Sequence, residues 1–299
     1  MPPVSTVIVA FQSGEFLRRC LTAVASGSGE VVVVDNGSPD LEATLVREEF
    51  PLVRLIERST NAGFAKAANA GIAATGARWV LLLNPDAWPI DDGVERLVDF
   101  VEGEPGVGAA GPLLFDEQGR AQRSTIRPPL SPATLALWAA LPEVVSHAYG
   151  LWRRATGGLR RERVRQEEFL QGAVMLLRRD AFDRIGGFDE SFFMYGEDAD
   201  LCARLRAAGW RVELCPAARF VHVGGGSTRG QDDRMRIELL RSWLRLIAKL
   251  DSLDEAERAR RWLRHAMRVR ALATRRRRDR SVASWLGSGT VGDLLGLPG

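Results

Sequence analysis

Three groups of residues in this sequence combine types and spacings that could do chemistry. Asn84-Pro85-Asp86 comes directly after the apolar run WVLLL at 79–83. Glu197, Asp198 and Asp200 place three carboxylates within four residues, just after the run FFMY at 192–195. His222 lies shortly before a run of glycines, in a chain that has only three histidines. We therefore ask what a carboxylate at a strand end, a carboxylate cluster and a single imidazole could do together.

Each group fits a known kind of polar chemistry. A carboxylate at the end of an apolar strand can bind Mg²⁺ or Mn²⁺ together with a diphosphate, because these ions prefer oxygen ligands. Carboxylates as close as those at 197–200 need a cation, a shared proton or an exposed position, and such crowding is one way to obtain a general base. His222 could contact a metal or a phosphate.

Each group also has a purely structural explanation. Asn-Pro and Pro-Asp are common turn dipeptides, so Asn84-Pro85-Asp86 could be a turn only. Asp198 or Asp200 could cap the helix that follows them, although capping accounts for one carboxylate and not for three. A lone histidine is commonly structural unless neighbouring elements bring it to a shared site. The functional interpretation therefore depends on which elements position these residues.

The first hundred residues alternate between two patterns. Short apolar runs at 5–11, 30–35, 52–57 and 79–84 are typical of buried strands. Apolar residues recur every three or four positions at 14–25, 40–50, 63–75 and 91–102, which predicts helices. This alternation predicts a mostly parallel central sheet flanked by helices, with ligands at the carboxyl ends of the strands. Those ends are Ala10-Phe11, Asp35-Asn36-Gly37 and Asn84-Pro85-Asp86.

Two other nucleotide-binding functions are compatible with alternating strands and helices, but the sequence lacks the motifs that they need. A third alternative uses the carboxylates as the catalytic pair of a hydrolase. A dinucleotide-binding fold needs G-x-G-x-x-G after the first strand, whereas this chain has Phe11-Gln12-Ser13-Gly14, with one glycine. A nucleotidyltransferase would normally carry a glycine-rich and basic loop there, and the same segment has no basic residue. Two carboxylates could also serve a glycoside hydrolase, but that function does not explain the βα half.

Length and composition are those of a globular protein, with an uneven distribution of charge. The chain has 299 residues and a net charge of +3, values that exclude collagen, low-complexity disorder and a disulfide-rich miniprotein. Residues 1–227 carry 24 basic and 29 acidic side chains, whereas residues 228–280 carry 17 basic and 8 acidic ones. Three cysteines without C-x-x-C spacing predict a reducing compartment and no structural zinc. We expect neither a signal peptide nor a membrane-spanning segment.

The second half is less regular and predicts a domain division. Prolines and basic residues suggest an irregular insertion near 118–166, after which regular patterns return at 169–179 and 199–208. Two basic amphipathic helices are expected over 231–280, divided near 251–254, followed by a frayed, glycine-rich end at 287–299. We predict a catalytic domain over 1–227, with a nucleotide-binding half at 1–110 and an acceptor half at 111–227, and a helical segment over 228–299.

The sequence allows more than one binding partner for the basic helical segment. Residues 234–280 could lie on an anionic membrane surface, at about 1 kcal/mol for each basic side chain near the lipid. They could equally pack as a helical pair on the catalytic domain or against a second subunit in a homodimer. Nucleic-acid binding fits the charge but lacks an accompanying motif, and we do not expect it.

Taken together, these residues resemble a known family. The sequence is similar to the family-2 inverting glycosyltransferases with the GT-A fold, and most similar to their bacterial rhamnosyltransferase-like branch. The resemblance covers about residues 4–227. It rests on six blocks in the family's order: VVDNGS at 33–38, NAGFAKAANAG at 61–71, LLNPD at 82–86, Gly172-Ala173, GGFDE at 186–190, and Glu197-Asp198 with Arg204, Gly209-Trp210 and His222.

The resemblance implies where the donor nucleotide binds. Asp35 matches the carboxylate that recognises the pyrimidine base. The segments lining the base and ribose correspond to Ala10, Phe11, Asn61, Gly63, Lys66 and Asn69. Asn84-Pro85-Asp86 stands at the family's D-x-D element, where Asn84 replaces the first aspartate and is expected to contact the nucleotide.

The resemblance also implies the reacting groups. Asp198 matches the catalytic base, and Asp86 and His222 match the ligands of a Mn²⁺ or Mg²⁺ ion. Gly172, Ala173, Glu197 and Trp210 match the donor-sugar and acceptor pocket. The expected activity is metal-dependent transfer from a nucleotide-diphospho-sugar, with dTDP-rhamnose as the expected donor, to a saccharide or lipid-linked acceptor. The alternative is a non-catalytic scaffold of the same fold that binds a sugar nucleotide or a membrane. The expected location is cytoplasmic, peripheral on the inner face of the plasma membrane.

Overall fold

Four strands, three of them mostly apolar in sequence, form the first half of a central sheet. In the computed structural model these are β1 (Val4–Ala10), β2 (Val31–Asp35), β3 (Arg54–Glu57) and β4 (Trp79–Leu83), all parallel. The structure describes residues 4–25, 27, 29–39, 42–122, 132–140, 165–166, 169–224, 232–274 and 276–297. β1, β2 and β4 are almost wholly buried, as strands covered on both faces must be. The predicted parallel half is therefore present.

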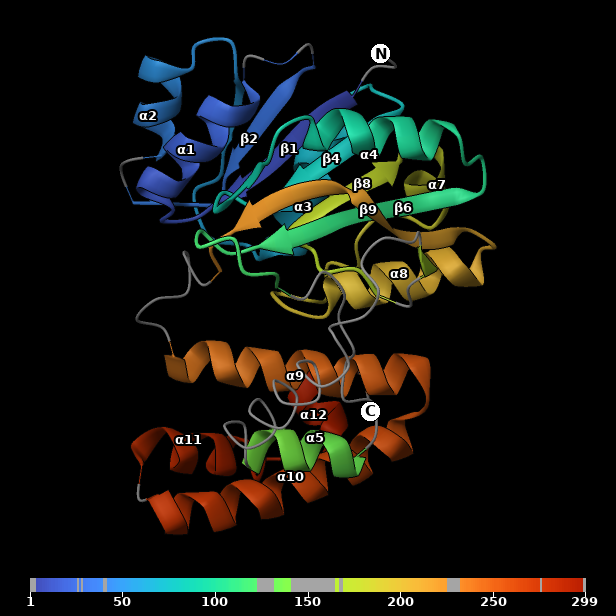
Figure 1. The fold of residues 1–299 in the computed structure, drawn as a ribbon. Coiled ribbons are helices and arrows are strands. Elements are labelled where there is room, and N and C mark those ends of the chain that lie inside the picture. Colours follow the sequence, from blue (N-terminus) through green and yellow to red (C-terminus); the bar gives the residue numbers. More distant parts are fainter. Residues whose placement is uncertain are drawn as a thin grey trace. The chain divides into compact units, whose positions relative to one another are not determined.

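The other half of the sheet is mixed rather than parallel. β8 (Val174–Arg178) runs antiparallel to β4 and β6 (Val107–Phe115), and β9 (Arg211–His222) lies parallel to β6. β5 (Ala87–Pro89) and β7 (Arg165–Gln166) both pair antiparallel with β9. The strand order is β3-β2-β1-β4-β8-β6-β9-β5, and Figure 1 labels β2, β1, β4, β8, β6 and β9 within it. The residue pattern at 212–215 predicts a short strand, and β9 extends well beyond it to His222.

The helices around this sheet lie where the periodicity predicts them. They are α1 (Gly14–Val24), α2 (Glu42–Glu49), α3 (Phe64–Ala73), α4 (Gly93–Glu102) and α8 (Glu197–Ala207). The short helix α7 (Arg179–Arg184) was not predicted. Gly71 lets α3 approach the sheet closely, because a Cβ there would lie 2.5 Å from Val7 Cγ1 and 2.8 Å from Val34 Cγ2. The sheet and helices together place three strand ends of the βα half at one edge.

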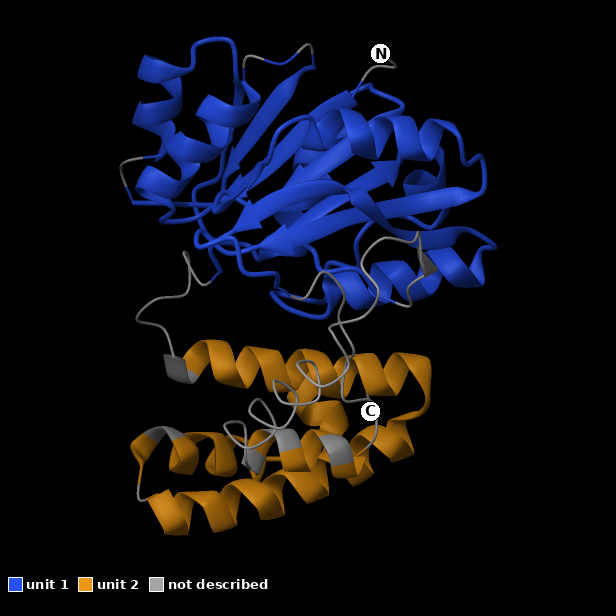
Figure 2. Cartoon of the chain, viewed as in Figure 1, with its two compact units in different colours: residues 1–127, 162–229 blue, residues 128–161, 230–299 orange. Residues whose placement is uncertain are grey.

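The chain forms two compact units, which Figure 2 shows in different colours. One consists of residues 1–127 and 162–229, and the other of residues 128–161 and 230–299. The sequence analysis placed all of the segment 118–166 in the catalytic domain. The structure groups 128–161 with the C-terminal helices instead, because α5 (Pro132–Ala140) packs on α10 (Leu253–Thr274). Most of the remaining predicted insertion lies outside the described residues.

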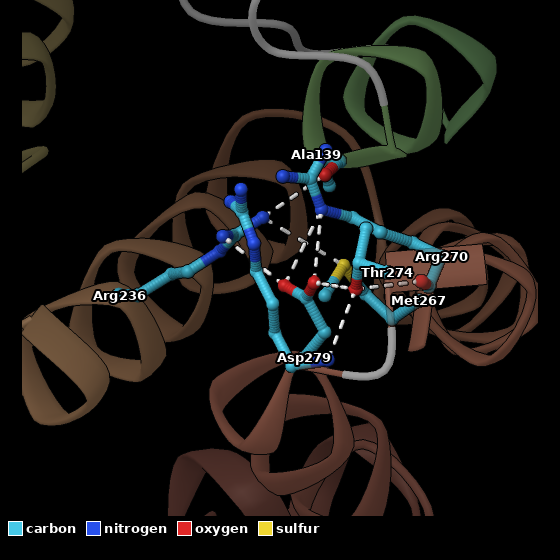
Figure 3. Close-up of polar contacts among 7 residues, drawn as sticks. Ala139, Arg236, Met267, Arg270, Thr274 and Asp279 are labelled. Carbon is cyan, nitrogen blue, oxygen red and sulfur yellow. Dashed lines mark hydrogen bonds and ion pairs between the residues drawn. The ribbon is translucent and has the colours of Figure 1, made fainter. Parts of the chain in front are cut away.

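The second unit is a bundle of helices with a charged centre. Its other helices are α9 (Asp232–Leu250), α11 (Arg277–Trp285) and α12 (Val291–Leu295). Asp279, fully buried, lies 3.3 Å from Arg270 Nε and 3.5 Å from Arg236 Nη1 and accepts a 2.7 Å hydrogen bond from Thr274 Oγ1. Figure 3 shows this cluster joining α9, α10 and α11, while Arg236 also donates to the carbonyl of Ala139 on α5.

The end of the chain differs from the prediction of a frayed tail. Residues 291–295 form α12, which begins with a capping box in which Thr290 accepts from the Asp293 N–H and the Asp293 carboxylate accepts from the Thr290 N–H. This reciprocal pairing satisfies two otherwise unpaired donors at a helix start. None of the helices in the described part of the chain is both long and apolar enough to cross a membrane. Cys20, Cys202 and Cys215 are free and buried.

Candidate functional site

Two strand ends bring the predicted base and the predicted metal-binding element together. β4 and β8 pair up to Leu83 and Val174, so the residues after β4 meet those before β8. The Asn84 N–H donates to the Ala173 carbonyl at 2.8 Å. The preceding Gly172 N–H donates to Asp198 Oδ2 at 2.9 Å. Two adjacent residues, Gly172 and Ala173, therefore connect the 84–86 segment to the first turn of α8.

Asp198 is a buried carboxylate held by backbone donors. Its Oδ1 accepts from the Ala199 N–H at 2.8 Å, while Oδ2 accepts from Gly172. Burial raises the pKa of Asp198 to about 6, and the backbone hydrogen bonds oppose that rise. At neutral pH the side chain is thus ionised but a much better proton acceptor than an exposed aspartate.

Glu197 has the opposite protonation state at neutral pH. Burial and the adjacent Asp198 raise the pKa of its carboxyl to about 8. Its Oε2 is buried and has no hydrogen-bond partner among the described residues. Neighbouring carboxyls with separated pKa values are a usual arrangement for distinct acid and base roles. The pair therefore presents one neutral acid and one carboxylate.

The third carboxylate of the cluster has a structural role. Asp200 is 1% exposed and forms a 2.7 Å ion pair with Arg204 Nε, one turn along α8. Arg204 also donates to the carbonyls of Ile185 and Gly187, at 2.9 and 2.7 Å. The pair therefore fixes the GGFDE segment against α8. Neither Asp198 nor Asp200 caps the helix, because Gly196 occupies the N-cap position.

The backbone bends sharply just before α8. Tyr195 and Gly196 have φ of 68° and 79°, two successive residues in the left-handed region. Tyrosine rarely adopts this conformation, and such strain often occurs at functional sites. The bend turns the chain so that Glu197 and Asp198 begin the helix beside Gly172.

Asp86 and His222 form the second part of the site. Ala87 pairs with His222 in the β5–β9 ladder, which brings Asp86 Oδ1 to 3.6 Å from His222 Nε2. Both side chains are buried, and Asp86 Oδ2 also accepts from the Gly224 N–H at 3.1 Å. Burial lowers the pKa of His222, against an opposing effect of Asp86, so the imidazole is neutral at neutral pH. Gln122 contacts the other side of His222, with Oε1 3.2 Å from Nδ1.

This pair fits a divalent cation shared with a diphosphate. A separation of 3.6 Å is too long for a hydrogen bond but suits two ligands of one ion, since Mg²⁺ binds its ligands at about 2.1 Å. A neutral imidazole and a carboxylate are both suitable donors for Mn²⁺. The described residues contain no group of three or more His, Cys, Asp or Glu side chains that could hold a metal alone. Phosphate oxygens and water would supply the remaining ligands.

The residues predicted to bind the nucleotide base lie at the neighbouring strand ends. Ala10 pairs with Asp35 at the ends of β1 and β2, and both are buried. Asp35 Oδ1 accepts from the Ser38 N–H at 2.9 Å, while Ser38 Oγ accepts from the Gln12 N–H at 3.1 Å. These bonds hold together the loop that contains Phe11 and the loop after β2.

The 61–69 segment is held by contacts that the sequence analysis did not predict. Asn36 donates to Asn61 Oδ1 at 3.0 Å and to the Gly63 carbonyl at 3.2 Å. Gly63 has φ of 91°, and a Cβ there would lie 2.6 Å from the Phe193 carbonyl oxygen, so no other residue fits well. The Phe64 N–H donates to that same carbonyl at 2.8 Å. The segment therefore packs directly against the loop before α8.

Three of the residues matched by resemblance have surroundings that the sequence does not predict. Lys66 is exposed on α3. Asn69 uses its side chain to hold the GGFDE segment, since it donates to the Phe188 carbonyl and accepts from the Phe188 N–H, both at 2.9 Å. Trp210 follows α8, at the opposite end from Asp198, and directly precedes the start of β9, whereas His222 ends that strand. The structure therefore does not bring Trp210 to the site.

Glu42 occupies the start of α1, the position at which dinucleotide-binding folds hold a phosphate. The carboxylate of Glu42 accepts from the N–H groups of Ser13 and Gly14 at the start of α1. Because a helix N-terminus holds one anion at these donors, the glutamate occupies the place of a pyrophosphate. Glu42 and Gln122 lack any local sequence motif, and only their pairing with distant residues identifies them. Asn36 lies in the VVDNGS block, but its contacts with Asn61 and Gly63 are visible only in the structure.

Comparison with known proteins identifies relatives with this arrangement of elements. Glycosyl transferase family 2 matches residues 5–186, and Glycosyl transferase family group 2 matches residues 161–292. The chain is 32% identical over 250 residues to N-acetylglucosaminyl-diphospho-decaprenol L-rhamnosyltransferase of Mycobacterium tuberculosis strain H37Rv, covering 76% of this chain and 77% of that protein. It is 29% identical over 237 residues to the succinoglycan biosynthesis protein ExoO of Rhizobium meliloti, covering 76% and 62%.

Solved structures share the fold at low identity. Mannosyltransferase PcManGT from Pyrobaculum calidifontis, in complex with GDP-Man and Mn²⁺, has a TM-score of 0.55 at 17% identity, covering 98% of this chain and 85% of that one. GalNAc-T7 with UDP, GalNAc and Mn²⁺ has a TM-score of 0.57 at 14% identity, covering 83% and 48%. The predicted GT-A fold is therefore confirmed.

Proposed function

The chain belongs to glycosyl transferase family 2 and is a glycosyltransferase, and we propose that it transfers a sugar from a nucleotide-diphospho-sugar with inversion, assisted by a divalent cation. The proposed donor is dTDP-rhamnose, and the proposed acceptor is a saccharide or lipid-linked saccharide at the inner face of the plasma membrane. The mycobacterial relative supports this choice, because it is named as an L-rhamnosyltransferase of N-acetylglucosaminyl-diphospho-decaprenol. The product would enter a cell-surface polysaccharide or glycolipid.

One observation supports this proposal above the others. The N–H of Gly172 and the carbonyl of Ala173 contact Asp198 and Asn84, respectively, so one dipeptide holds the proposed base and the proposed metal-binding segment. A transferase of this class needs a base for the acceptor and charge neutralisation for the leaving group within one sugar ring of each other. The dipeptide provides that proximity.

Asp198 would carry out the proton transfer. As the acceptor oxygen bonds to the anomeric carbon, the hydroxyl proton passes to the carboxylate of Asp198. The bond from the anomeric carbon to the diphosphate oxygen breaks, and its electron pair leaves with the nucleoside diphosphate. A single displacement of this kind inverts the configuration and needs no covalent nucleophile. Glu197, neutral beside the base, adds no second negative charge at neutral pH.

Asp86 and His222 would hold the cation together with the donor diphosphate. When bound, the cation would act as a Lewis acid for the negative charge that develops on the diphosphate. Asp35, at the end of β2, would contact the nucleotide base, and Asn84 would contact the nucleotide near the metal. The Mn²⁺ in both neighbouring GT-A structures supports a cation in this fold.

Turnover with defined donors tests the proposal. Purified protein would be incubated with a panel of nucleotide sugars, with and without Mn²⁺, and the released nucleoside diphosphate and the anomeric configuration of the product would be measured. We expect release from dTDP-rhamnose, metal dependence and an inverted product. A product of retained configuration would contradict the single displacement, and turnover only with another donor would replace dTDP-rhamnose.

Asp198→Asn tests the base separately from donor binding. We expect loss of transfer with nearly unchanged donor affinity by calorimetry, because the amide keeps the shape but cannot accept the proton. Asp183→Asn, at an exposed position on α7, is the matched control and should keep full activity. Turnover retained in Asp198→Asn would exclude Asp198 as the base.

A further inference from the structure

One side of α10 carries large apolar side chains and arginines at the surface of the helical unit. Residues 258, 261, 262, 265, 268, 269 and 272 are all exposed and recur every three or four positions, so they lie on one side of the helix. We call six of these side chains the outer α10 face: Arg258, Arg261, Trp262, Arg268, Val269 and Leu272.

The opposite side of α10 is fixed in the core of its unit. Leu263 and Met267 are fully buried there, and Arg270 is buried beside Asp279. α10 packs in this way on α5, α9 and α11. The outer α10 face is therefore turned to solvent by the packing of the unit, and rotation of the helix would expose its core side.

The apolar side of α9 is buried and cannot bind lipid. The apolar residues of α9 that could enter a bilayer, such as Trp243, Leu244 and Ile247, are buried within the helical unit. Several arginines of 234–280 are also used internally, since Arg260 donates to the Leu286 carbonyl at 2.6 Å and Arg236 to the Ala139 carbonyl at 3.0 Å. The basic and apolar surface predicted over 234–280 thus narrows to the outer α10 face and the start of α11.

Apolar and basic groups alternate on this face in the way that lipid binding requires. Trp262, Val269 and Leu272 are 58%, 54% and 81% exposed. Arg258, Arg261 and Arg268 are exposed beside them. Arg258 also pairs with Glu255, and Arg261 lies 3.9 Å from Glu257, whereas the sequence from Arg258 to Arg278 contains no acidic residue. Such a helix can lie in the plane of a membrane, with apolar side chains among the acyl chains, tryptophan at the interface and arginines at the phosphates.

We propose that the outer α10 face docks on the surface of a bilayer rich in anionic phospholipid. A second copy of this face would meet it with like charges. A nucleic acid would match the arginines but offers no apolar phase to cover Leu272, the most exposed large apolar side chain of the face. Only an anionic bilayer accommodates both groups. The proposal does not depend on the identity of the sugar donor or acceptor.

Vesicle binding tests the proposal with the full-length protein. Cosedimentation would use vesicles of equimolar phosphatidylglycerol and phosphatidylcholine, and vesicles of phosphatidylcholine alone as the uncharged comparison. Arg268→Glu and Leu272→Ser remove one basic and one apolar contact of the face, and both positions are exposed, so the variants should fold. We expect each to weaken binding to the anionic vesicles by about tenfold or more, and binding to fall at high salt.

A charge-matched control separates this face from the net charge of the protein. Arg96→Glu changes the total charge as Arg268→Glu does, but Arg96 lies on α4, in the other unit, and should leave vesicle binding unchanged. Trp262→Phe gives a second readout, because only the wild-type spectrum should contain the blue shift of Trp262 on anionic vesicles.

Each other outcome would overturn the proposal. No binding of the wild type to anionic vesicles, or equal binding by the wild type and both α10 variants, excludes this face as the docking surface. The variants could instead bind vesicles as the wild type does but lose binding to a nucleic-acid duplex, in which case the face binds nucleic acid. If they bind vesicles normally but no longer form a dimer that the wild type forms in sedimentation velocity, the face is a dimer interface.

Discussion

Gln122 holds the ring and the backbone of His222 at the same time. Its Nε2 donates to the His222 carbonyl at 2.6 Å, and its Oε1 lies 3.2 Å from His222 Nδ1. Because a carbonyl only accepts, the first bond fixes the orientation of the amide, and the proton of the neutral imidazole must lie on Nδ1. This leaves the lone pair on Nε2, the atom that faces Asp86. Gln122 is thus a positioning residue for the proposed metal ligand.

Gln122→Leu should therefore weaken metal binding rather than metal-free nucleotide binding. We expect a loss of about 10- to 100-fold in Mn²⁺ affinity, the usual effect of removing a partner of a metal-bound histidine. Calorimetry with Mn²⁺ in the presence of the nucleoside diphosphate measures this directly, with Asp86→Ala as the ligand-deleted comparison. Gln118→Leu, exposed in the same loop, is the control. Equal Mn²⁺ affinity in wild type and Gln122→Leu would rule out this role.

The rate should depend on pH through Asp198. Burial raises the pKa of its carboxyl to about 6, and only the ionised form accepts a proton, so kcat/KM is expected to rise through about pH 6. Glu197→Gln should leave this acid limb in place, because Glu197, with a pKa of about 8, is neutral in that range and glutamine is also neutral. A displacement of the limb by one pH unit in that variant would mean that Glu197 is ionised there.

Glu197 should also make the stability of the fold depend on pH. Its pKa is raised from 4.5 to about 8 in the folded chain, so the native state binds this proton more tightly than the unfolded state. The free energy of unfolding therefore falls as pH rises between these two values. Glu197→Gln should remove that loss. The free energy of unfolding of the variant, relative to wild type, should therefore be higher at about pH 9 than at about pH 4, by about 2 kcal/mol or more. Urea unfolding at both pH values measures the difference; an equal effect at both would contradict it.

Gly172→Ala should misplace the base. A Cβ at Gly172 would lie 3.3 Å from both Cβ and Oδ2 of Asp198, so Asp198 must shift by a few tenths of an ångström. Small displacements of reacting groups lower the rate strongly, and we expect kcat to fall about tenfold to a hundredfold with a smaller change in KM. Gly76→Ala, where nothing lies within 4 Å of the added Cβ, is the matched control. Full kcat in Gly172→Ala would show that this contact is not needed.

Asp279→Asn should destabilise the helical unit. The substitution leaves Arg236 and Arg270 near a neutral amide in the cluster of Figure 3. Removing one partner of a buried ion pair costs about 3–5 kcal/mol, because the remaining charges stay desolvated. Urea unfolding followed by circular dichroism measures the loss, and Asp254→Asn, exposed at the start of α10, should change stability little. Equal unfolding free energies of the wild type and Asp279→Asn would show that the charge of Asp279 does not stabilise the cluster.

The strands and helices of the first half could be predicted because their signals are local. β1, β2 and β4 lie within one or two residues of the predicted apolar runs, since buried parallel strands are continuous apolar segments. The mixed half was less readable. β9 begins with apolar residues interrupted by Glu213 and continues through Pro216 to His222, and its partners lie far away in sequence. Strand direction in such a sheet depends on pairing and not on the pattern of one segment.

By itself, the sequence determined the chemical types at the site: a carboxylate after β4 and a carboxylate pair at the start of α8. It also determined the uneven distribution of charge along the chain. Tertiary structure decided which of these act together. Asp200 pairs with Arg204, Asn69 holds Phe188, and Trp210 lies away from Asp198. The tertiary structure also places Gln122 against His222 and exposes one side of α10. The physical reason is that burial and hydrogen bonding are properties of neighbours in space, which the chain brings together only when it folds.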